Sequence, residues 1–239
     1  MTRLSMQART QLRSICKFWI VAASVLVLSG CTIASRSTVP NLFDAQRQIE
    51  EYIASGRYDA DFAKVAREAE SYLEKRAGAV TKPAIVLDID ETSLSNWPAY
   101  KANGWARIVN GECDLTQGPC GLRAWQGMAQ SAALQPTLRL VKRAKALGVA
   151  VFFISGRPPA LREATETNLR AQGFEWDEVI IYPEGAKFAS AVDFKAQERR
   201  KIADHGYTII LSMGDQKSDL QGGYAERTFK LPNPVYYLP

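Results

Sequence analysis

Hydrophobic and polar positions follow two different patterns along residues 41–231. Within residues 41–77 the apolar side chains recur near the spacing of amphipathic helices, and Gly56 and Gly78 interrupt the pattern, which predicts two successive helices. Beyond Gly78, short continuous apolar runs alternate with further helical patterns. Such runs predict strands that are buried on both faces of a sheet. The predicted strands cover residues 84–88, 149–154, 178–182, 207–213 and 227–231, and the predicted helices cover residues 122–130, 136–147, 159–172 and 194–204.

Strands that alternate with helices are typical of parallel βαβ units. We therefore predict the α/β fold class, with a doubly wound, Rossmann-like parallel sheet that follows two N-terminal helices. Residues 93–135 interrupt the alternation with a long irregular stretch that is rich in Trp, Gly and Asn. We expect this stretch to form a small helical or irregular cap, so that residues 41–239 make up one domain.

The N-terminal residues follow another pattern. Four basic residues precede an apolar run at 18–28, and small residues follow it, which indicates an export signal rather than a spanning helix. The signal ends in Leu-Ser-Gly-Cys, with the cysteine at position 31, and so resembles the lipobox of bacterial lipoproteins. The resemblance implies a signal peptide over 1–30, a lipid anchor on Cys31 and a short tether over 31–40. A plain secretory peptide and an uncleaved anchor are the alternatives.

The residue after Cys31 bears on the membrane. Thr32, in place of an aspartate, resembles signals that sort lipoproteins to the outer membrane. We therefore expect an outer-membrane lipoprotein that faces the periplasm or the cell surface.

The formal charge of +5 gives a misleading picture of the domain. Four basic residues lie in the signal, and the chain from Cys31 onward contains 26 basic and 25 acidic residues. A nearly neutral domain has no electrostatic footprint for nucleic acid, so we expect no nucleic-acid partner.

Two of the four cysteines belong to the domain. Cys16 lies in the signal and Cys31 would be lipidated, which leaves Cys113 and Cys120. In an oxidising periplasm this pair can form a structural disulfide that closes a short loop. A zinc site is the alternative, but the pair lacks partner ligands and the one histidine lies far away in the sequence.

Polar side chains follow several predicted strands at the point where each strand ends. Asp88 and Asp90 end the first strand, Ser155 follows the second, Asp215 follows the fourth, and Lys195 lies at a helix start. The carboxyl ends of parallel strands meet at one edge of a sheet, where ligands bind. Two acids at the end of an apolar strand are costly unless a cation or a reaction uses them. The sequence therefore predicts a metal-assisted phosphoryl-transfer site.

Each of these groups has a chemical role that suits phosphoryl transfer. The Asp88 carboxylate can attack phosphorus, and Asp90 can protonate the leaving oxygen and later activate water. Ser155 can donate a hydrogen bond to a phosphoryl oxygen, and Lys195 offers a point charge for phosphate. Asp215 supplies a hard oxygen for a divalent cation, for which Mg²⁺ is the expected ion.

The residues in this order resemble the four motifs of the haloacid dehalogenase (HAD) superfamily. The finer resemblance is to its subfamily IIIB acid phosphatases, which include bacterial lipoprotein acid phosphatases and plant vegetative storage proteins. The four motifs are Asp88-Ile-Asp90-Glu-Thr92, Ile154-Ser155-Gly156-Arg157, Lys195, and Gly214-Asp215-Gln-Lys-Ser-Asp219, and the tail Arg227 to Tyr237 supports the subfamily.

The resemblance implies a role for each of these residues. Asp88 would be the nucleophile and Asp90 the general acid and base. The metal ligands would be Asp88, the backbone carbonyl of Asp90, and Asp215. The phosphate-binding residues would be Ser155, Gly156 and Lys195, while Asp219, near the metal, and Arg157, at the substrate, rank below them. Ser155 stands where many members have threonine, and the segment with Cys113 and Cys120 lies outside the family pattern, which leaves the substrate preference open.

The predicted function is that of a Mg²⁺-dependent acid phosphatase that hydrolyses small phosphomonoesters through an aspartyl-phosphate. Nucleoside monophosphates are one candidate class, because aromatic residues of the cap could stack on a base, although packing of the cap is the simpler role for Trp97, Tyr100, Trp105 and Trp125. A non-catalytic surface lipoprotein on the same fold and a phosphotransferase are the alternatives. The sequence contains no Arg-His-Gly, Cys-x₅-Arg or P-loop motif, which excludes the corresponding phosphate-handling enzymes.

Overall fold

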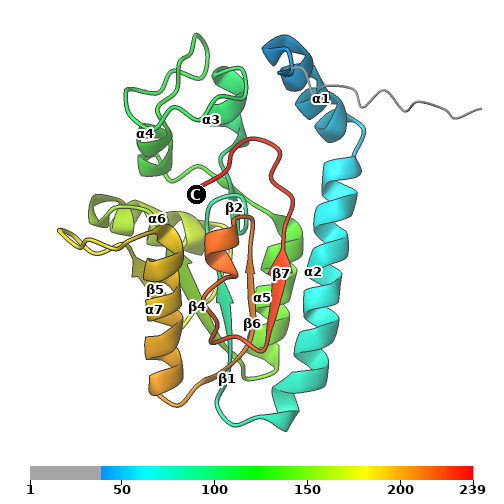
Figure 1. The fold of residues 1–239 in the computed structure, drawn as a ribbon, viewed down its shortest axis with the longest axis vertical. Coiled ribbons are helices and arrows are strands. Elements are labelled where there is room, and N and C mark those ends of the chain that lie inside the picture. Colours follow the sequence, from blue (N-terminus) through cyan, green and yellow to red (C-terminus); the bar gives the residue numbers. More distant parts are fainter. Residues whose placement is uncertain (1–38, 239) are drawn as a thin grey trace, which may run out of the picture. The chain divides into compact units, whose positions relative to one another are not determined.

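A five-stranded parallel sheet lies at the centre of the structure, a computed structural model that describes residues 39–238 (Figure 1). The strand order is β5-β4-β1-β6-β7. The strands are β1 (Pro83–Leu87), β4 (Ala150–Ser155), β5 (Glu178–Ile181), β6 (Thr208–Gly214) and β7 (Arg227–Lys230). Each lies within about two residues of a predicted strand, and the doubly wound parallel α/β fold is confirmed.

The apolar runs form strands because both faces of the sheet are buried. In β1, Ile85 and Leu87 pack into one hydrophobic cluster, whereas Ala84 and Val86 pack into the other. Successive side chains of a strand point to opposite faces, so a strand between two layers of helices must be apolar at every position.

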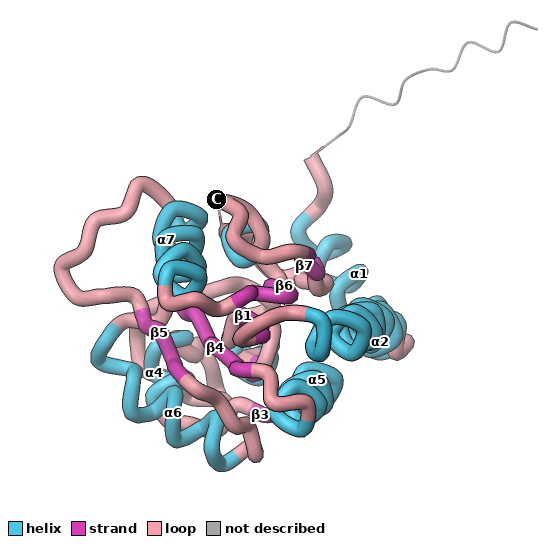
Figure 2. Tube along the Cα trace, turned by 90° about the horizontal axis from the view of Figure 1, so that it is seen from below, coloured by secondary structure: helices cyan, strands magenta, loops and turns pink. Residues whose placement is uncertain are grey.

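Helices cover each face of the sheet (Figure 2). On one face lie α2 (Arg57–Arg76), α5 (Gln135–Ala146) and α6 (Arg162–Ala171), and on the other lies α7 (Ala191–Asp204). Residues 39–238 also contain three short 3₁₀ helices, η1 (Ala77–Ala79), η2 (Pro159–Leu161) and η3 (Lys217–Asp219).

Two helix starts differ from the sequence prediction for local reasons. The predicted helix at 159–172 begins as η2, whose first residue is Pro159 and whose N-cap is Pro158, and becomes α-helical only at Arg162. Helix α7 begins three residues earlier than predicted. Its N-cap is Ser190, whose hydroxyl accepts a hydrogen bond from the backbone N–H of Asp193 at 3.1 Å.

The N-terminal helices form as predicted and have different neighbours. Helix α1 (Leu42–Ala54) is joined to α2 through Gly56, whose φ of 73° is readily adopted only by glycine. In α1, Ile49 and Ile53 pack against the core of residues 93–135, and Gln46 donates a hydrogen bond to the Gly104 carbonyl at 2.6 Å. Helix α2 instead packs along α5, β6 and β7.

Residues 93–135, the cap, leave and rejoin the sheet layer through a small antiparallel pair of strands. The pair is β2 (Leu94–Ser95) with β3 (Ala132–Ala133). The cap contains α4 (Leu122–Gly127), which was predicted, and α3 (Trp97–Ala102), which was not. Six buried residues give the cap its own hydrophobic core: Ala99, Tyr100, Trp105, Cys120, Leu122 and Trp125. Helix α3 has a single apolar-periodic turn, which is too short for the sequence pattern to show.

The predicted signal peptide, lipidated Cys31 and nearly all of the tether lie outside the described residues. Within residues 39–238, none of the helices has the length and apolar character needed to cross a membrane.

Leu73 tests how α2 is held on the sheet. Its side chain is fully buried in the cluster beneath α2 and α5. We expect Leu73→Ala to lower the free energy of unfolding by about 3 kcal/mol, because it removes buried apolar contacts and leaves a cavity. Urea denaturation of the purified protein measures this change, with Lys75→Ala, an exposed position of the same helix, as the control. Equal stability of the two variants would contradict the packing described here.

Candidate active site

The candidate site lies at the carboxyl edge of the sheet, where the chain changes direction. From β1 the chain runs to β4 and β5 on one side and then returns to β6 and β7 on the other. Ligands of open α/β sheets bind at such a switch point. Asp88 directly follows β1 and Asp215 directly follows β6, so the neighbouring strands bring these two acids together.

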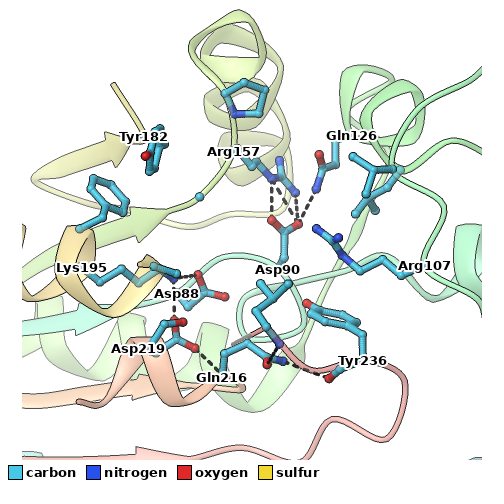
Figure 3. A pocket seen from close by; sticks show the side chains of 18 of the residues that line it. Asp88, Asp90, Arg107, Gln126, Arg157, Tyr182, Lys195, Gln216, Asp219 and Tyr236 are labelled. Carbon is cyan, nitrogen blue, oxygen red and sulfur yellow. Dashed lines mark hydrogen bonds and ion pairs between the residues drawn. The ribbon is translucent and has the colours of Figure 1, made fainter. Parts of the chain in front are cut away.

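Lys195 of α7 bridges two buried acids (Figure 3). Its ammonium nitrogen donates to Oδ1 of Asp88 at 2.5 Å and to Oδ1 of Asp219 at 2.6 Å. All three side chains are at least nine-tenths buried. Breaking a buried ion pair by removing one partner is costly because the remaining charge is left without compensation.

Asp219 is fixed in the loop after β6 by several further contacts. The backbone N–H of Gln216 donates to its Oδ2 at 2.7 Å. Its backbone carbonyl accepts hydrogen bonds from the Ser212 hydroxyl at 2.7 Å and from the buried Arg199 guanidinium at 3.0 Å. These contacts aim the carboxylate at Lys195 and into the site.

Asp88, Asp215 and Asp219 together form a candidate metal site. Each can offer one carboxylate oxygen such that the three oxygens lie within 4.8 Å of one another. Asp215 is also oriented by Gln216 Nε2 at 2.6 Å and Asn233 Nδ2 at 2.7 Å, which both donate to its Oδ2. A buried set of carboxylate oxygens suits a hard divalent cation.

Two of the expected ligands, Asp88 and Asp215, belong to this set, and the Asp219 carboxylate joins them. Asp219 was expected near the metal but ranked lower. The backbone carbonyl of Asp90, the third expected ligand, stays a prediction, because the cluster is defined by side-chain oxygens alone. The Asp90 side chain points away from the cluster (Figure 3).

The electrostatics of the acid cluster favour a bound cation. Burial raises the pKa of Asp88 well above its usual range, and Lys195 opposes this shift while Asp219 and Asp215 add to it. Burial and the Asp219 carboxylate raise the pKa of Asp215 to about 6, against its hydrogen bonds from Asn233 and Gln216. A divalent cation would offset the mutual repulsion that these shifts express.

Asp90 is held by a different set of donors from both the sheet and the cap. Its Oδ1 accepts hydrogen bonds from Arg157 Nη2 at 2.7 Å, Asn96 Nδ2 at 2.7 Å and Gln126 Nε2 at 3.0 Å. Arg157 also donates from Nη1 to the Thr165 hydroxyl at 3.0 Å, which fixes the guanidinium. Burial alone would raise the pKa of Asp90, but Arg157 and the other donors hold it below its usual range.

Arg157 therefore has a defined place. The sequence predicts Arg157 as a lower-ranked contact of the substrate. The structure pairs it with Asp90, and both residues line the pocket. Arg157 positions the carboxylate that is predicted to move protons.

Ser155 and Gly156, the predicted phosphate-binding pair, are placed differently from each other. Gly156 lines the pocket together with Asp88 and Lys195. Ser155 is fully buried and is not part of that lining, and its hydroxyl accepts the backbone N–H of Arg157 at 3.2 Å. The geometry thus gives Ser155 a place in shaping the turn, while its contact with phosphate stays a prediction.

The aromatic residues suggested for base stacking pack inside the cap instead. Tyr100, Trp105 and Trp125 belong to the cap core, and Trp97 packs against it. None of them lines the pocket. Other aromatic residues do so: Tyr182, Phe194 and Tyr236. The stacking role suggested for the cap aromatics is therefore wrong.

Glu91, which was not among the predicted site residues, connects the site to the C-terminal segment. Glu91 is buried with a φ of 54°, and its carboxylate accepts from the Asn96 backbone N–H at 2.6 Å, the Tyr100 hydroxyl at 3.0 Å and the Tyr236 hydroxyl at 3.1 Å. Burial and the Asp90 charge raise the pKa of Glu91 to about 8. Glu91 thus joins the loop after β1 to the cap and to the C-terminal segment.

The C-terminal segment, residues 232–238, forms one wall of the pocket. Tyr236 and Leu238 line the pocket, and the Leu238 N–H donates to Gln216 Oε1 at 2.9 Å. In the sequence analysis, the Pro, Asn and Tyr residues of this segment served only to support the resemblance to the subfamily. The same residues could have been used to predict that the segment lies at the pocket.

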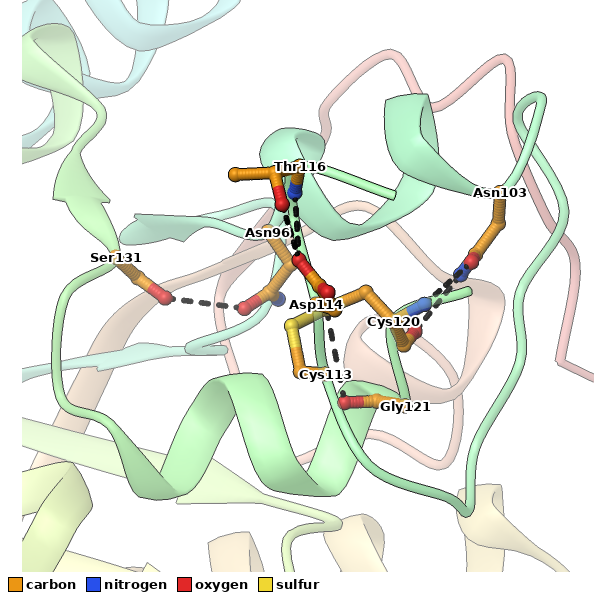
Figure 4. Close-up of a disulfide and its surroundings, with 8 residues drawn as sticks. All are labelled: Asn96, Asn103, Cys113, Asp114, Thr116, Cys120, Gly121 and Ser131. Atoms are coloured by element: carbon orange, nitrogen blue, oxygen red, sulfur yellow. Dashed lines mark hydrogen bonds between the residues drawn. A yellow bond between two sulfur atoms is a disulfide. The ribbon is translucent and has the colours of Figure 1, made fainter. Parts of the chain in front are cut away.

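Cys113 and Cys120 are joined by a disulfide in the cap, the pairing that the sequence analysis favoured over a zinc site (Figure 4).

His205, at the end of α7, has its Nδ1 2.7 Å from the Lys201 carbonyl oxygen and lies outside the acid cluster.

Known proteins are similar to this chain in sequence and in fold. The family model described as HAD superfamily, subfamily IIIB (acid phosphatase) matches residues 1–239. The chain is 32% identical over 217 residues to the stem 28 kDa glycoprotein of Glycine max, covering 89% of this chain and 82% of that protein. It is 30% identical over 193 residues to acid phosphatase 1 of Solanum lycopersicum, covering 80% of this chain and 73% of that protein.

A solved structure has a similar fold. The class C acid phosphatase from Bacillus anthracis superimposes with a TM-score of 0.64 at 24% identity, covering 82% of this chain and 86% of that chain.

Gly214 tests the arrangement of the acids. A Cβ at this position would overlap the Asp219 carboxylate, so Gly214→Ala must displace Asp219 from Lys195 and from the cluster. We expect the affinity for Mg²⁺, measured by isothermal titration calorimetry, to fall by about tenfold or more, as for other losses of residues that orient ligands. Gly78→Ala is the control, because a Cβ there meets no atom within 4 Å. Unchanged Mg²⁺ affinity in Gly214→Ala would show that Asp219 is not needed for the metal.

Proposed function

Since the chain belongs to subfamily IIIB of the HAD superfamily and is a phosphomonoesterase of the acid phosphatase family, we propose that it hydrolyses small phosphomonoesters with Mg²⁺ through an aspartyl-phosphate on Asp88. The observation that carries this proposal is the arrangement of Asp88, Lys195 and Asp90 around one pocket. A nucleophile, its orienting cation and a separate proton carrier are the groups that such a displacement needs.

The attack step follows from how Asp88 is held. Lys195 donates to Oδ1 of Asp88, and among the described residues no side chain donates to Oδ2. Oδ2 is therefore the oxygen that attacks phosphorus, and the bond between phosphorus and the ester oxygen breaks. Lys195 orients the carboxylate and favours its ionised form, against the burial that raises the pKa of Asp88.

Asp90 handles the protons in both halves of the reaction. In the first half the protonated form of Asp90, which Arg157 disfavours in the resting site, gives its proton to the departing ester oxygen. In the second half it takes a proton from the water that attacks the aspartyl-phosphate, which releases phosphate and restores Asp88. Arg157, Asn96 and Gln126 fix the carboxylate in the pocket, so that one group can serve both the leaving oxygen and the water.

Asp88, Asp215 and Asp219 would hold the divalent cation, which supplies charge neutralisation between these acids and the anionic phosphoryl group. The residues present fit Mg²⁺ because all of the clustered donor atoms are carboxylate oxygens. Substrates are small phosphate esters, and nucleoside monophosphates belong in the first panel to be assayed.

We also propose that the domain is tethered by a lipid on Cys31 and faces the periplasm from the outer membrane. The sequence from the basic N-terminus to Cys31 supports this proposal. The Cys113–Cys120 disulfide agrees with an oxidising compartment.

Asp88→Asn tests the nucleophile. The amide keeps the shape of the side chain but cannot form the aspartyl-phosphate, so turnover of p-nitrophenyl phosphate should fall by about a thousandfold or more while the circular dichroism spectrum is unchanged. Chelation of divalent cations should abolish wild-type turnover, and added Mg²⁺ should restore it. Glu163→Gln, an exposed change on α6, is the charge-matched control. Turnover in Asp88→Asn near the wild-type rate would exclude this mechanism, and transfer of phosphate to an added alcohol in place of water would identify a phosphotransferase.

Cys31→Ser tests the anchor. Without the thiol no lipid can be attached, so the protein should move from the membrane fraction to the soluble periplasmic fraction, as followed by immunoblot of fractionated cells. Cys16→Ser should leave the protein in the membrane fraction. Membrane retention of Cys31→Ser would favour an uncleaved anchor.

A further inference from the structure

Residues 107–123 form a hairpin in the cap that is closed by the Cys113–Cys120 disulfide (Figure 4). Backbone hydrogen bonds join its arms, among them those from Gly121 N–H to the Glu112 carbonyl at 2.8 Å and from Leu122 N–H to the Ile108 carbonyl at 2.8 Å. We call this segment the disulfide hairpin. It contains the cysteines that the resemblance leaves outside the family pattern.

The base of the disulfide hairpin is clamped to α3. Asn103 donates from Nδ2 to the Cys120 carbonyl at 2.8 Å, and its Oδ1 accepts the Cys120 N–H at 2.7 Å. The disulfide, the backbone hydrogen bonds and these contacts of Asn103 fix the backbone of the hairpin. Its first and last residues are Arg107 and Arg123.

Both arginines line the pocket that contains Asp88 and Asp90 (Figure 3 labels Arg107). The Arg107 guanidinium lies 5.2 Å from the ring centre of Tyr236, and Arg123 Nη1 donates to the Asn110 side chain at 3.3 Å. Within residues 39–238, neither arginine forms an ion pair with a carboxylate. Two exposed cations at the pocket are therefore free to meet an anion.

The deeper cations are not free in this way. Lys195 is paired with Asp88 and Asp219, and Arg157 is paired with Asp90. The reacting phosphoryl group must lie against Asp88, in the buried part of the pocket. The rest of the ester then extends toward the exposed side, where the arginines of the disulfide hairpin lie. Arginine is the side chain best suited to carboxylate and phosphoryl groups, because its donors form a planar fork.

We propose that the disulfide hairpin forms a second anion subsite, so that the preferred substrate carries a carboxylate or a second phosphoryl group in addition to the ester that is hydrolysed. This inference rests on the proposed phosphatase function and narrows its substrate class. The subsite consists of Arg107 and Arg123, which both line the pocket.

Matched aryl phosphates test the subsite in the full-length protein purified in detergent. Phenyl phosphate carries only the ester phosphate, 4-carboxyphenyl phosphate adds a carboxylate, and 1,4-phenylene bisphosphate adds a phosphoryl group. The wild-type kcat/KM should be higher by about tenfold or more for at least one of the two substrates with an added anionic group than for phenyl phosphate. A charge-assisted contact of the added group would give this gain. The larger of the two ratios identifies which anion the subsite prefers, after correction for the two equivalent esters of the bisphosphate.

The double variant Arg107→Gln/Arg123→Gln should reduce this ratio to about one, through KM rather than kcat. Arg107→Lys/Arg123→Lys, which keeps the charge and loses the fork, should retain part of the ratio. Arg139→Gln, an exposed arginine of α5 outside the pocket, is the matched control and should keep the full ratio.

Three results would overturn the subsite. A wild-type ratio near one, or a ratio that survives in the double variant, would leave the two arginines as solvated surface residues. Equal loss of kcat/KM for phenyl phosphate and for the anionic substrates would place the arginines on the reacting phosphoryl group instead. Absence of hydrolysis of every substrate by the wild-type protein would instead contradict the proposed function, so the two failures are distinguishable.

Discussion

Lys195 places one positive charge between two carboxylates at the buried edge of the sheet, and the site cannot be assembled without it. Asp88 and Asp219 come from loops after two different strands and would repel each other in a medium from which water is excluded. The ammonium group of α7 offsets only part of this repulsion, since Asp215 adds a third acid to the cluster. The cluster thus keeps an excess of negative charge, which a divalent cation would offset.

The same constraint explains why the neighbouring parts of the site are so heavily hydrogen bonded. Asp90 lies two residues from Asp88 and avoids the acid cluster by turning toward Arg157. That turn connects Asp90, the proposed proton carrier, to the cap, because Asn96 and Gln126 belong to the cap and donate to the same oxygen. Glu91 makes a second connection, through Tyr236, to the C-terminal segment. The cap and the tail are therefore attached to the catalytic loop itself, so the segments that surround the substrate also position the groups that act on it.

Much of the fold could be predicted from the sequence because local patterns determine it. The apolar runs that became β1, β4 and β6 are buried on both faces, and such burial leaves a continuous hydrophobic signature. Helix α3 and the short strands β2 and β3 left no such signature, because a segment of two to six residues is too short to show a period. Helix α3 depends on contacts within the cap core, whereas Leu94 of β2 and Ala133 of β3 pack into the large cluster of the sheet. The sequence does not reveal these contacts.

The order of strands and helices along the chain was enough to predict that Asp88, Asp90, Lys195 and Asp215 would meet at one edge of a parallel sheet. How the charges pair once they meet could not be predicted in this way. The folded protein shows that the Asp90 side chain turns to Arg157 while Asp219 joins Asp88 and Asp215. It also shows that the cap tryptophans are packing residues and that two arginines of the disulfide hairpin line the pocket. Backbone topology brings residues to an edge, whereas the direction of each side chain depends on the donors and acceptors of segments that are distant in sequence.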